Sequence, residues 1–208
     1  MESLHHWSVF TAIAFFIAFT PGPGVILALA NSLTYGPARA MISSLGNAAG
    51  LIVVAIATTA GLGAILIASS GAFFALKIAG AGYLIYLGIK QWFSKTSAFD
   101  DSVNIPGSAS ARHLFIKGAA VAMTNPKTIM FFMAFFPQFI QSGISYTGQV
   151  SVMIATLAVC TIIAHLIYVV LAHLLKPVLT AENKRKKINF IFGASFITLG
   201  LSLFTLRG

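Results

Sequence analysis

Charged residues are scarce in this chain, which argues against a soluble protein. Only 8% of the 208 residues are charged and 58% are hydrophobic, with a mean hydropathy of +0.91. A typical soluble domain has about 25% charged residues. The length matches one domain, and no polar stretch is long enough to form a second, soluble one. We therefore interpret residues 1–208 as a single domain of an integral membrane protein.

Cysteine and clustered metal ligands are also lacking. Cys160 is the single cysteine, so no disulfide can form within the chain, and chemistry that needs two thiols is disfavoured. His5 and His6 are adjacent but have no nearby third ligand, which argues against a metal site. The apolar segments hold no convincing Ser/His, Asp/Asp or metal constellation for hydrolysis. We expect neither a cofactor nor an enzymatic activity.

Six apolar segments are long enough to cross a membrane. A transmembrane helix needs about 20 apolar residues. The segments that meet this requirement are 7–32, 41–68, 72–93, 114–138, 147–174 and 187–206. The linkers are short, except for residues 94–113, whose Ser, Asp and Gly content is typical of a loop. The predicted fold is all-α, with six transmembrane helices.

The positive charges predict the orientation of these helices. The net charge is +9, and most basic residues lie in or beside the linkers after the first, third and fifth segments: Arg39, Lys90, Lys95, Arg112, Lys117, Lys176, Lys184, Arg185, Lys186 and Lys187. Loops that carry an excess of Lys and Arg face the cytoplasm. This rule places both termini outside. It also explains the basic composition without nucleic acid, which we do not expect as a partner.

Two proline dipeptides interrupt long apolar segments, Thr20-Pro21 in the first and Asn125-Pro126 in the fourth. Proline has no backbone N–H and breaks a helix in mid-run. Broken backbone at membrane depth is tolerated only where protein or a water-filled cavity satisfies it. Thr and Asn are good N-cap residues, and Pro is favoured at the first helical position. Each dipeptide therefore predicts the start of a new half-helix near the bilayer centre.

The two breaks suggest an internal repeat. Three segments per half require the second half, about 114–206, to enter the membrane in the opposite orientation from the first, about 7–93. The breaks occupy corresponding places in these halves, which the loop 94–113 connects on the cytoplasmic side. Such a pattern is typical of secondary transporters built from inverted repeats. The alternative is two independent proline kinks, which are common in membrane helices.

Several motifs resemble those of the LysE/RhtB family of amino-acid exporters. They cover almost the whole chain in order: Thr20-Pro21-Gly22-Pro23, Gly46 with Gly50, Gly80-Ala81-Gly82-Tyr83-Leu84 with Leu87-Gly88, Thr124-Asn125-Pro126-Lys127, Phe131-Phe132 and Phe136-Pro137-Gln138-Phe139. The resemblance implies a six-helix exporter of amino acids or close derivatives in the bacterial cytoplasmic membrane, driven by the proton gradient. Gly24 and Leu51 depart from the family, where many members have Asp or Asn and some have an acidic residue, respectively.

The half-helices that start at Pro21 and Pro126 should have N-termini that converge on one site. Each N-terminus presents unpaired N–H groups and a partial charge of about +0.5, which suits a carboxylate. Glycines allow a ligand to approach the backbone closely. The substrate-binding candidates at the two breaks are Thr20, Pro21, Gly22, Pro23, Gly24, Thr124, Asn125, Pro126 and Lys127. The alternative is that these residues only cap the breaks.

Three further polar residues lie inside the apolar segments. Lys127 costs about 2.5–3.5 kcal/mol near the centre of a span. It could anchor a carboxylate, change its charge during transport, or satisfy backbone carbonyls freed at the break. Asn47, between Gly46 and Gly50, could contact the ligand or bond to a neighbouring helix. His165 is the second candidate, with Lys127, for coupling to protons, although a lone histidine is more often structural.

The four acidic residues, Glu2, Asp100, Asp101 and Glu182, all fall outside the six segments. A site without a buried carboxylate is poorly suited to a cationic side chain. The sequence therefore favours a neutral amino acid such as threonine, homoserine or leucine. A channel or an assembly subunit without coupled transport is the alternative function, and a homodimer stays open.

Overall fold

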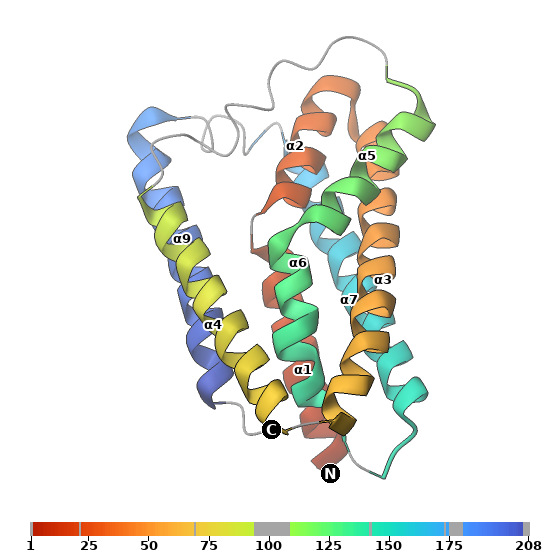
Figure 1. Cartoon of the computed structure of the whole chain (residues 1–208). Coiled ribbons are helices and arrows are strands. Elements are labelled where there is room, and N and C mark those ends of the chain that lie inside the picture. Colours follow the sequence, from red (N-terminus) through yellow and green to blue (C-terminus); the bar gives the residue numbers. More distant parts are fainter. Residues whose placement is uncertain are drawn as a thin grey trace.

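The computed structural model describes residues 2–20, 22–68, 70–93, 109–141, 143–172, 174 and 181–205. Every secondary-structure element in these residues is helical (Figure 1). The predicted all-α class is confirmed.

The first predicted span is a helix broken near its middle. Helix α1 runs over Glu2–Phe19 and α2 over Pro23–Tyr35, with a bend of 52° between them. Gly22 is the N-cap of α2, and Pro23 takes the first helical position, where its missing N–H leaves no helical bond unmade. The prediction that this half-helix starts at Pro21 with Thr20 as its cap is therefore wrong, since the Thr20 hydroxyl donates back to Phe16 O of α1. Pro21 lies outside the described residues. Helix α2 ends at Gly36, whose φ of 84° favours glycine.

The second break has nearly the same bend, 53°. Helix α5 covers Ala111–Thr124, and α6 covers Pro126–Met130. Asn125 lies between them and caps α6, because its side-chain oxygen accepts a hydrogen bond from the Lys127 N–H at 3.0 Å. This capping explains why the chain resumes a helical path immediately after the proline.

Beyond α6 the helix widens and then narrows. Residues Phe131–Phe135 form a π-helical turn, η2, and Phe136–Phe139 form a 3-10 turn, η3. Pro137 cannot donate the hydrogen bond that a regular α-helix needs at this position, so the bonding pattern changes around it. Phe131, Phe132, Phe135 and Phe136 are all at most 2% exposed as a result of this tight packing.

The described residues also contain the helices α3 (Pro37–Ala68), α4 (Ser70–Trp92), α7 (Tyr146–Val170) and α9 (Glu182–Thr205). Within α3 and α7, Pro37–Gly61 and Tyr146–Val170 are long and apolar enough to cross a membrane. The described residues thus contain two unbroken candidate spans, or four when each bent pair counts as one. The count of six stays a prediction.

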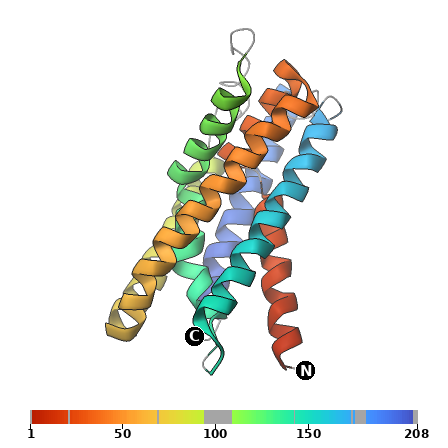
Figure 2. The ribbon, with the colours of Figure 1, turned by 90° about the vertical axis from the view of Figure 1, so that its right-hand side faces the viewer.

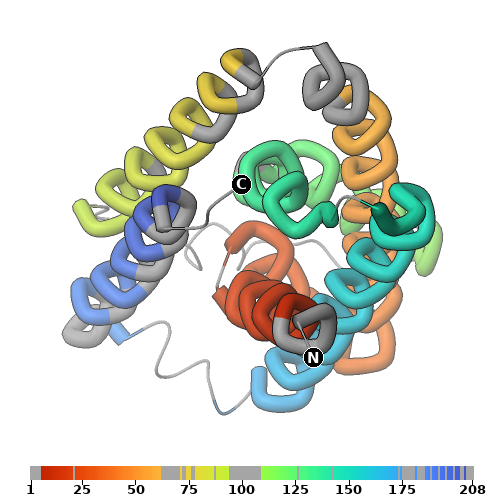
Figure 3. Tube along the Cα trace, turned by 90° about the horizontal axis from the view of Figure 1, so that it is seen from below, coloured from red at the N-terminus to blue at the C-terminus, as the bar shows by residue number. Residues whose placement is uncertain are grey.

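Glycines bring two pairs of helices into close contact. A Cβ on Gly46 or Gly50 of α3 would collide with the backbone of α5 at Phe115 or Ala119. A Cβ on Gly88 of α4 would lie 2.6 Å from the carbonyl oxygen of Gly193 in α9. Figure 3 shows the α4–α9 pair on one side of the molecule and α3 with α7 on the other. Helices α1 and α6 lie between them.

The helix ends separate into two groups (Figures 1 and 2). Helix α1 begins and α9 ends at the same end of the molecule. Helices α3, α5 and α9 begin, and α4 ends, at the opposite end. Those opposite ends include Arg39, Lys90, Arg112 and Lys187. Residues 94–108 of the predicted loop 94–113 and 176–180 of the predicted loop 176–186 lie outside the described residues. Helix α9 already begins at Glu182, five residues before the predicted start of the sixth segment.

Candidate functional site

A small cavity lies where the two helix breaks meet. It has a volume of about 40 Å³ and is lined by residues from both breaks and from α3 and α7: Ile17, Ala18, Gly22, Gly24, Val25, Asn47, Leu51, Asn125, Lys127, Thr128, Phe131, Leu157, Thr161 and His165. A cavity of roughly 150 Å³ is needed to hold benzene, whereas water needs only about 10–15 Å³. The space that the described residues leave here therefore has room for water but not for an amino acid.

The N-terminus of α2 opens onto this cavity. Gly22 has no side chain with which to cap it, and the first helical hydrogen bond runs from the Ile26 N–H to the Gly22 carbonyl. The N–H groups of Gly24 and Val25 precede that bond and therefore have no acceptor within the helix. Both residues line the cavity. The uncapped, positive end of the α2 dipole thus borders this small space.

Lys127 is the central side chain of the site. It is only 8% exposed, and its Nζ donates to the carbonyl oxygens of Thr20 at 2.7 Å and Ile17 at 3.1 Å. These carbonyls belong to the end of α1, before the first break, whereas Lys127 lies in the first turn of α6, just after the second break. Among the described lining residues Lys127 carries a full positive charge, and none is acidic. The lysine therefore ties the two breaks together through backbone oxygens.

Two other carbonyls near the end of α1 are also satisfied. The Thr20 hydroxyl donates to Phe16 O, and the Tyr168 hydroxyl of α7 donates to Phe19 O, both at 2.8 Å. The first break is thus held largely by side chains distant in sequence, while Asn125 caps the second locally. The two breaks are similar in shape but differ in chemistry, since α2 is left uncapped and α6 is capped by its own neighbour.

Polar groups from α3 and α7 complete the cavity. The Asn47 amide donates to Gly118 O at 3.4 Å and lies against Gly24, where a Cβ would be 2.8 Å from its Nδ2. His165 is 3% exposed, and its Nδ1 has no hydrogen-bond partner among the described residues. Thr161 lies one helical turn before His165 on the same face of α7. Asn47 and His165 therefore add polar groups from α3 and α7 to the cavity that Lys127 also lines.

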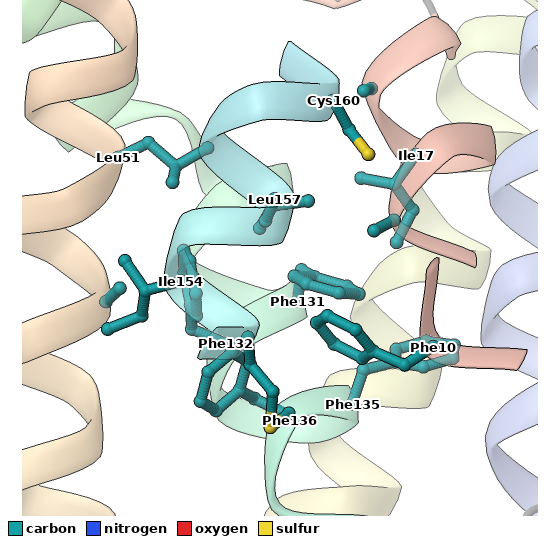
Figure 4. Close-up of a cluster of buried hydrophobic side chains, with 14 of the residues drawn as sticks. Phe10, Ile17, Leu51, Phe131, Phe132, Phe135, Phe136, Ile154, Leu157 and Cys160 are labelled. Atoms are coloured by element: carbon teal, nitrogen blue, oxygen red, sulfur yellow. The ribbon is translucent and has the colours of Figure 1, made fainter. Parts of the chain in front are cut away.

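Aromatic residues close the cavity on one side. Phe131 lines the cavity and also belongs to a buried cluster with Phe10, Phe132, Phe135 and Phe136. Figure 4 shows this cluster between α1 and α7, with Leu157 and Ile17 above it. The planes of Phe131 and Phe135 are stacked with ring centroids 5.6 Å apart. A polar molecule cannot pass these rings unless η2 and α1 move.

Comparison with known proteins identifies the family of this chain. A model of the family described as LysE type translocator matches residues 15–207. The chain belongs to this family. It is therefore a membrane protein of the transporter class, and the resemblance found in its motifs is confirmed.

Individual relatives of this LysE-family chain are moderately similar along their whole length. A homoserine/homoserine lactone efflux protein of Salmonella typhimurium is 31% identical, with 97% of each chain covered. An uncharacterized membrane protein of Vibrio cholerae is 29% identical, with 98% of each covered. The membrane protein YrhP of Bacillus subtilis is 27% identical over 95% of this chain and 98% of its own. No solved structure matches the chain.

The structure gathers most of the predicted binding candidates of this LysE-family site. Gly22, Gly24, Asn47, Asn125, Lys127 and His165 line the cavity, and the Thr20 carbonyl contacts Lys127. Thr124 is exposed, and its hydroxyl donates to Ala120 O within its own helix. Pro23 is exposed, and Pro126 is the first residue of α6. Both prolines therefore shape the backbone at a helix start.

Sequence reasoning missed three contributors. Thr128 and Thr161 line the cavity, and Tyr168 bonds to the end of α1. A signal for Thr161 was present, because Leu157, Thr161 and His165 recur every four residues and share one helix face. No pattern in the sequence pointed to Phe19 as the acceptor of the Tyr168 hydroxyl, since the two are 149 residues apart.

Proposed function

We propose that this protein is a secondary exporter of small neutral amino acids or close derivatives, such as homoserine, threonine or leucine. One observation carries the proposal. The uncapped start of α2 and the ammonium of Lys127 meet in one buried cavity that has no acidic residue among its described lining. The name of the Salmonella relative supports the substrate class. The protein works in the bacterial cytoplasmic membrane.

The proposed architecture has six spans in one domain, arranged as two inverted repeats over about 7–93 and 114–206. The nearly equal bends of 52° and 53° at the two breaks support this arrangement. The common location of the first and last helix ends supports an even number of spans (Figure 1). With the basic helix ends in the cytoplasm, both termini are external.

The substrate carboxylate binds at the N-terminus of α2. Gly24 and Val25 supply backbone N–H groups, and Lys127 supplies a positive charge beside them. An acidic partner for a lysine-like or arginine-like side chain is missing from the described lining, so the substrate side chain is neutral. Asn47, Thr161 and His165 face a hydroxyl group of that side chain.

Export requires the small cavity to widen and to open alternately to the two sides of the membrane. Opening toward the outside means separating the phenylalanine cluster, whereas loading happens at the end that carries the basic residues. Lys127 and His165 are the coupling candidates, because both are buried in the cavity and both can take up and release a proton. Coupling to the proton gradient follows if either does so in each cycle.

Transport in membrane vesicles tests the proposal. Everted vesicles that contain the protein should accumulate labelled homoserine in their lumen when respiring, and a protonophore should abolish the accumulation. Preloaded unlabelled homoserine should accelerate uptake of the label, because exchange needs an alternating site. Uptake without such acceleration would favour a channel, and no uptake of any amino acid in a full panel would refute the proposal.

Lys127→Met tests the coupling role. Methionine has a similar length but no charge, so we expect loss of uphill export. If only coupling is lost, downhill exchange persists, and if the anchor is lost, exchange fails too. Lys117→Met on the partly exposed face of α5 is the control. Uphill export by Lys127→Met that equals the wild type at every pH would return Lys127 to a structural role.

A further inference from the structure

Two backbone carbonyls at the end of α1 converge on a single ammonium group. The Lys127 Nζ bonds to Ile17 O and Thr20 O, which lie 110 and 107 residues away in sequence. The end of an α-helix carries a partial charge of about −0.5 and attracts cations. Phe19 O is not part of this group, because it accepts from Tyr168. The end of α1 therefore presents an uncharged acceptor pair that suits a primary ammonium.

The proposed substrate carries such a group. Every α-amino acid has an ammonium at neutral pH, and homoserine lactone retains it although its carboxylate is closed into an ester. Binding an ammonium in a buried cavity requires hydrogen-bond acceptors, since an unpaired cation there is very costly. The described lining has no carboxylate to fill this role. Backbone carbonyls are the remaining strong acceptors at the broken helix.

The geometry points to the Ile17 and Thr20 carbonyls as the half-site for the substrate ammonium, with Lys127 as a tethered ammonium that occupies it in the empty carrier. Substrate binding exchanges one ammonium for the other. The inference rests on the proposed function for the identity of the substrate. The two carbonyl contacts themselves do not depend on that function.

The position of Gly22 shows where the displaced lysine goes. A Cβ on Gly22 would lie 3.4 Å from Nζ and 3.6 Å from Cε of Lys127, so the ammonium already lies beside the start of α2. The flexible lysine stem needs only a short movement to reach a carboxylate bound at the N–H groups of Gly24 and Val25. The exchange thus keeps both positive charges paired, one with carbonyls and one with the carboxylate.

Chemical rescue tests the half-site without any transport assay. Lys127→Ala removes the stem and ammonium, and n-propylammonium replaces the missing atoms. We expect the melting temperature of purified Lys127→Ala to rise with n-propylammonium chloride, but not with tetramethylammonium chloride at equal ionic strength, because the latter has no N–H. The difference between the two salts should be much smaller in the wild type and in Lys117→Ala, because there Lys127 competes for the carbonyl pair. Equal effects of both salts on Lys127→Ala would overturn the inference.

Binding of homoserine lactone distinguishes two roles of Lys127. In one, the lysine occupies the ammonium half-site, and in the other it only anchors the carboxylate. If the lactone ammonium must displace Lys127, the Lys127→Ala variant should bind it about tenfold more tightly than the wild type, the equivalent of one charge-assisted hydrogen bond. Tighter binding supports the exchange. Equal or weaker binding contradicts it, because then Lys127 does not occupy the ammonium position.

The wild type provides a measurement that needs no variant. In counterflow with labelled homoserine, n-propylammonium should compete and tetramethylammonium should not, and the absence of this difference would count against the half-site. If no amino acid is transported at all, the proposed function fails. Rescue of Lys127→Ala by n-propylammonium would still show that the carbonyl pair binds ammonium groups.

Discussion

Individual residues in the cavity balance a burial cost against specific contacts. A lysine at membrane depth costs about 2.5–3.5 kcal/mol, and each hydrogen bond that involves a charged group returns roughly 1.5–3 kcal/mol. The two carbonyl contacts of Lys127 are therefore sufficient to hold it in place. Asn31 is different, because it is fully buried and both polar atoms of its amide lack a partner among the described residues.

Gly22→Val should impair transport strongly while the protein still inserts. The valine side chain would occupy the space next to the Lys127 ammonium and block the approach of a carboxylate to α2. Losing one charge-assisted hydrogen bond corresponds to about tenfold or more in transport affinity. Concentration-dependent uptake in everted vesicles measures the effect. Gly61→Val is the matched control, since a Cβ there meets nothing within 4 Å, and an unchanged affinity in Gly22→Val would remove Gly22 from the site.

Asn31→Leu should stabilise the protein. An unsatisfied buried polar group costs about 1–3 kcal/mol, and leucine has the same branched side-chain skeleton without the amide, although its methyl groups are larger. We expect the melting temperature to rise by a few degrees, at roughly 2–4 °C per kcal/mol. Ser32→Ala, next to it in α2, should lower it because Ser32 donates to Val169 O at 2.8 Å. Destabilisation of both variants would mean that Asn31 has a partner in the folded protein.

The positions of the cavity residues depend on where helices begin and on how closely neighbouring helices cross. Helix α2 starts without a side-chain cap, whereas α6 starts on Asn125, so only the first half-helix keeps free donors for a ligand. Helices α3 and α5 cross so closely that their glycines touch the opposite backbone. That crossing brings Asn47 to Gly118 O and holds its amide at the cavity. The contact between α3 and α5 therefore positions the Asn47 side chain within the cavity.

Gly46→Ala should weaken this crossing. Its Cβ would collide with the Phe115 carbonyl, and overpacking of this kind costs about 1–3 kcal/mol. We expect a lower melting temperature together with reduced transport, because the separated helices would move Asn47. Gly82→Ala is the control, since a Cβ there has no neighbour within 4 Å. A stability equal to that of the control would show that α3 and α5 tolerate a wider separation.

The whole molecule has its basic helix ends at one end and its first and last helix ends at the other (Figure 2). We expect reporter fusions at the C-terminus or within 139–146 to be active outside, and those within 94–113 or 176–186 to be active in the cytoplasm. The positive-inside rule is the physical basis. Paired alkaline phosphatase and fluorescent protein fusions distinguish the two sides. A cytoplasmic C-terminus would remove the inverted-repeat argument, because it would require an odd number of spans or a reversed charge rule.

Much of the element-level structure could be predicted because it depends on neighbouring residues. A proline removes a donor at its own position, so the breaks after Phe19 and at Asn125 follow from the local sequence. The sequence predicted two equivalent half-helix N-termini, but the two ends differ in their capping. Only the structure distinguishes the uncapped start of α2 from the start of α6, which Asn125 occupies with its own side chain.

The sequence by itself determined the helical class, the membrane character, the positions of the breaks and the family. These properties arise from hydropathy, charge and proline geometry, which act over a few residues. Tertiary structure decided the partners of Lys127, the contact of Asn47 with Gly24, and the small volume of the cavity. Those depend on how separate helices pack together, which for Lys127 and Thr20 joins residues 107 positions apart. Lys127 bonds to carbonyls at the end of α1 because that packing places them within its reach, and nothing near it in sequence specifies this choice.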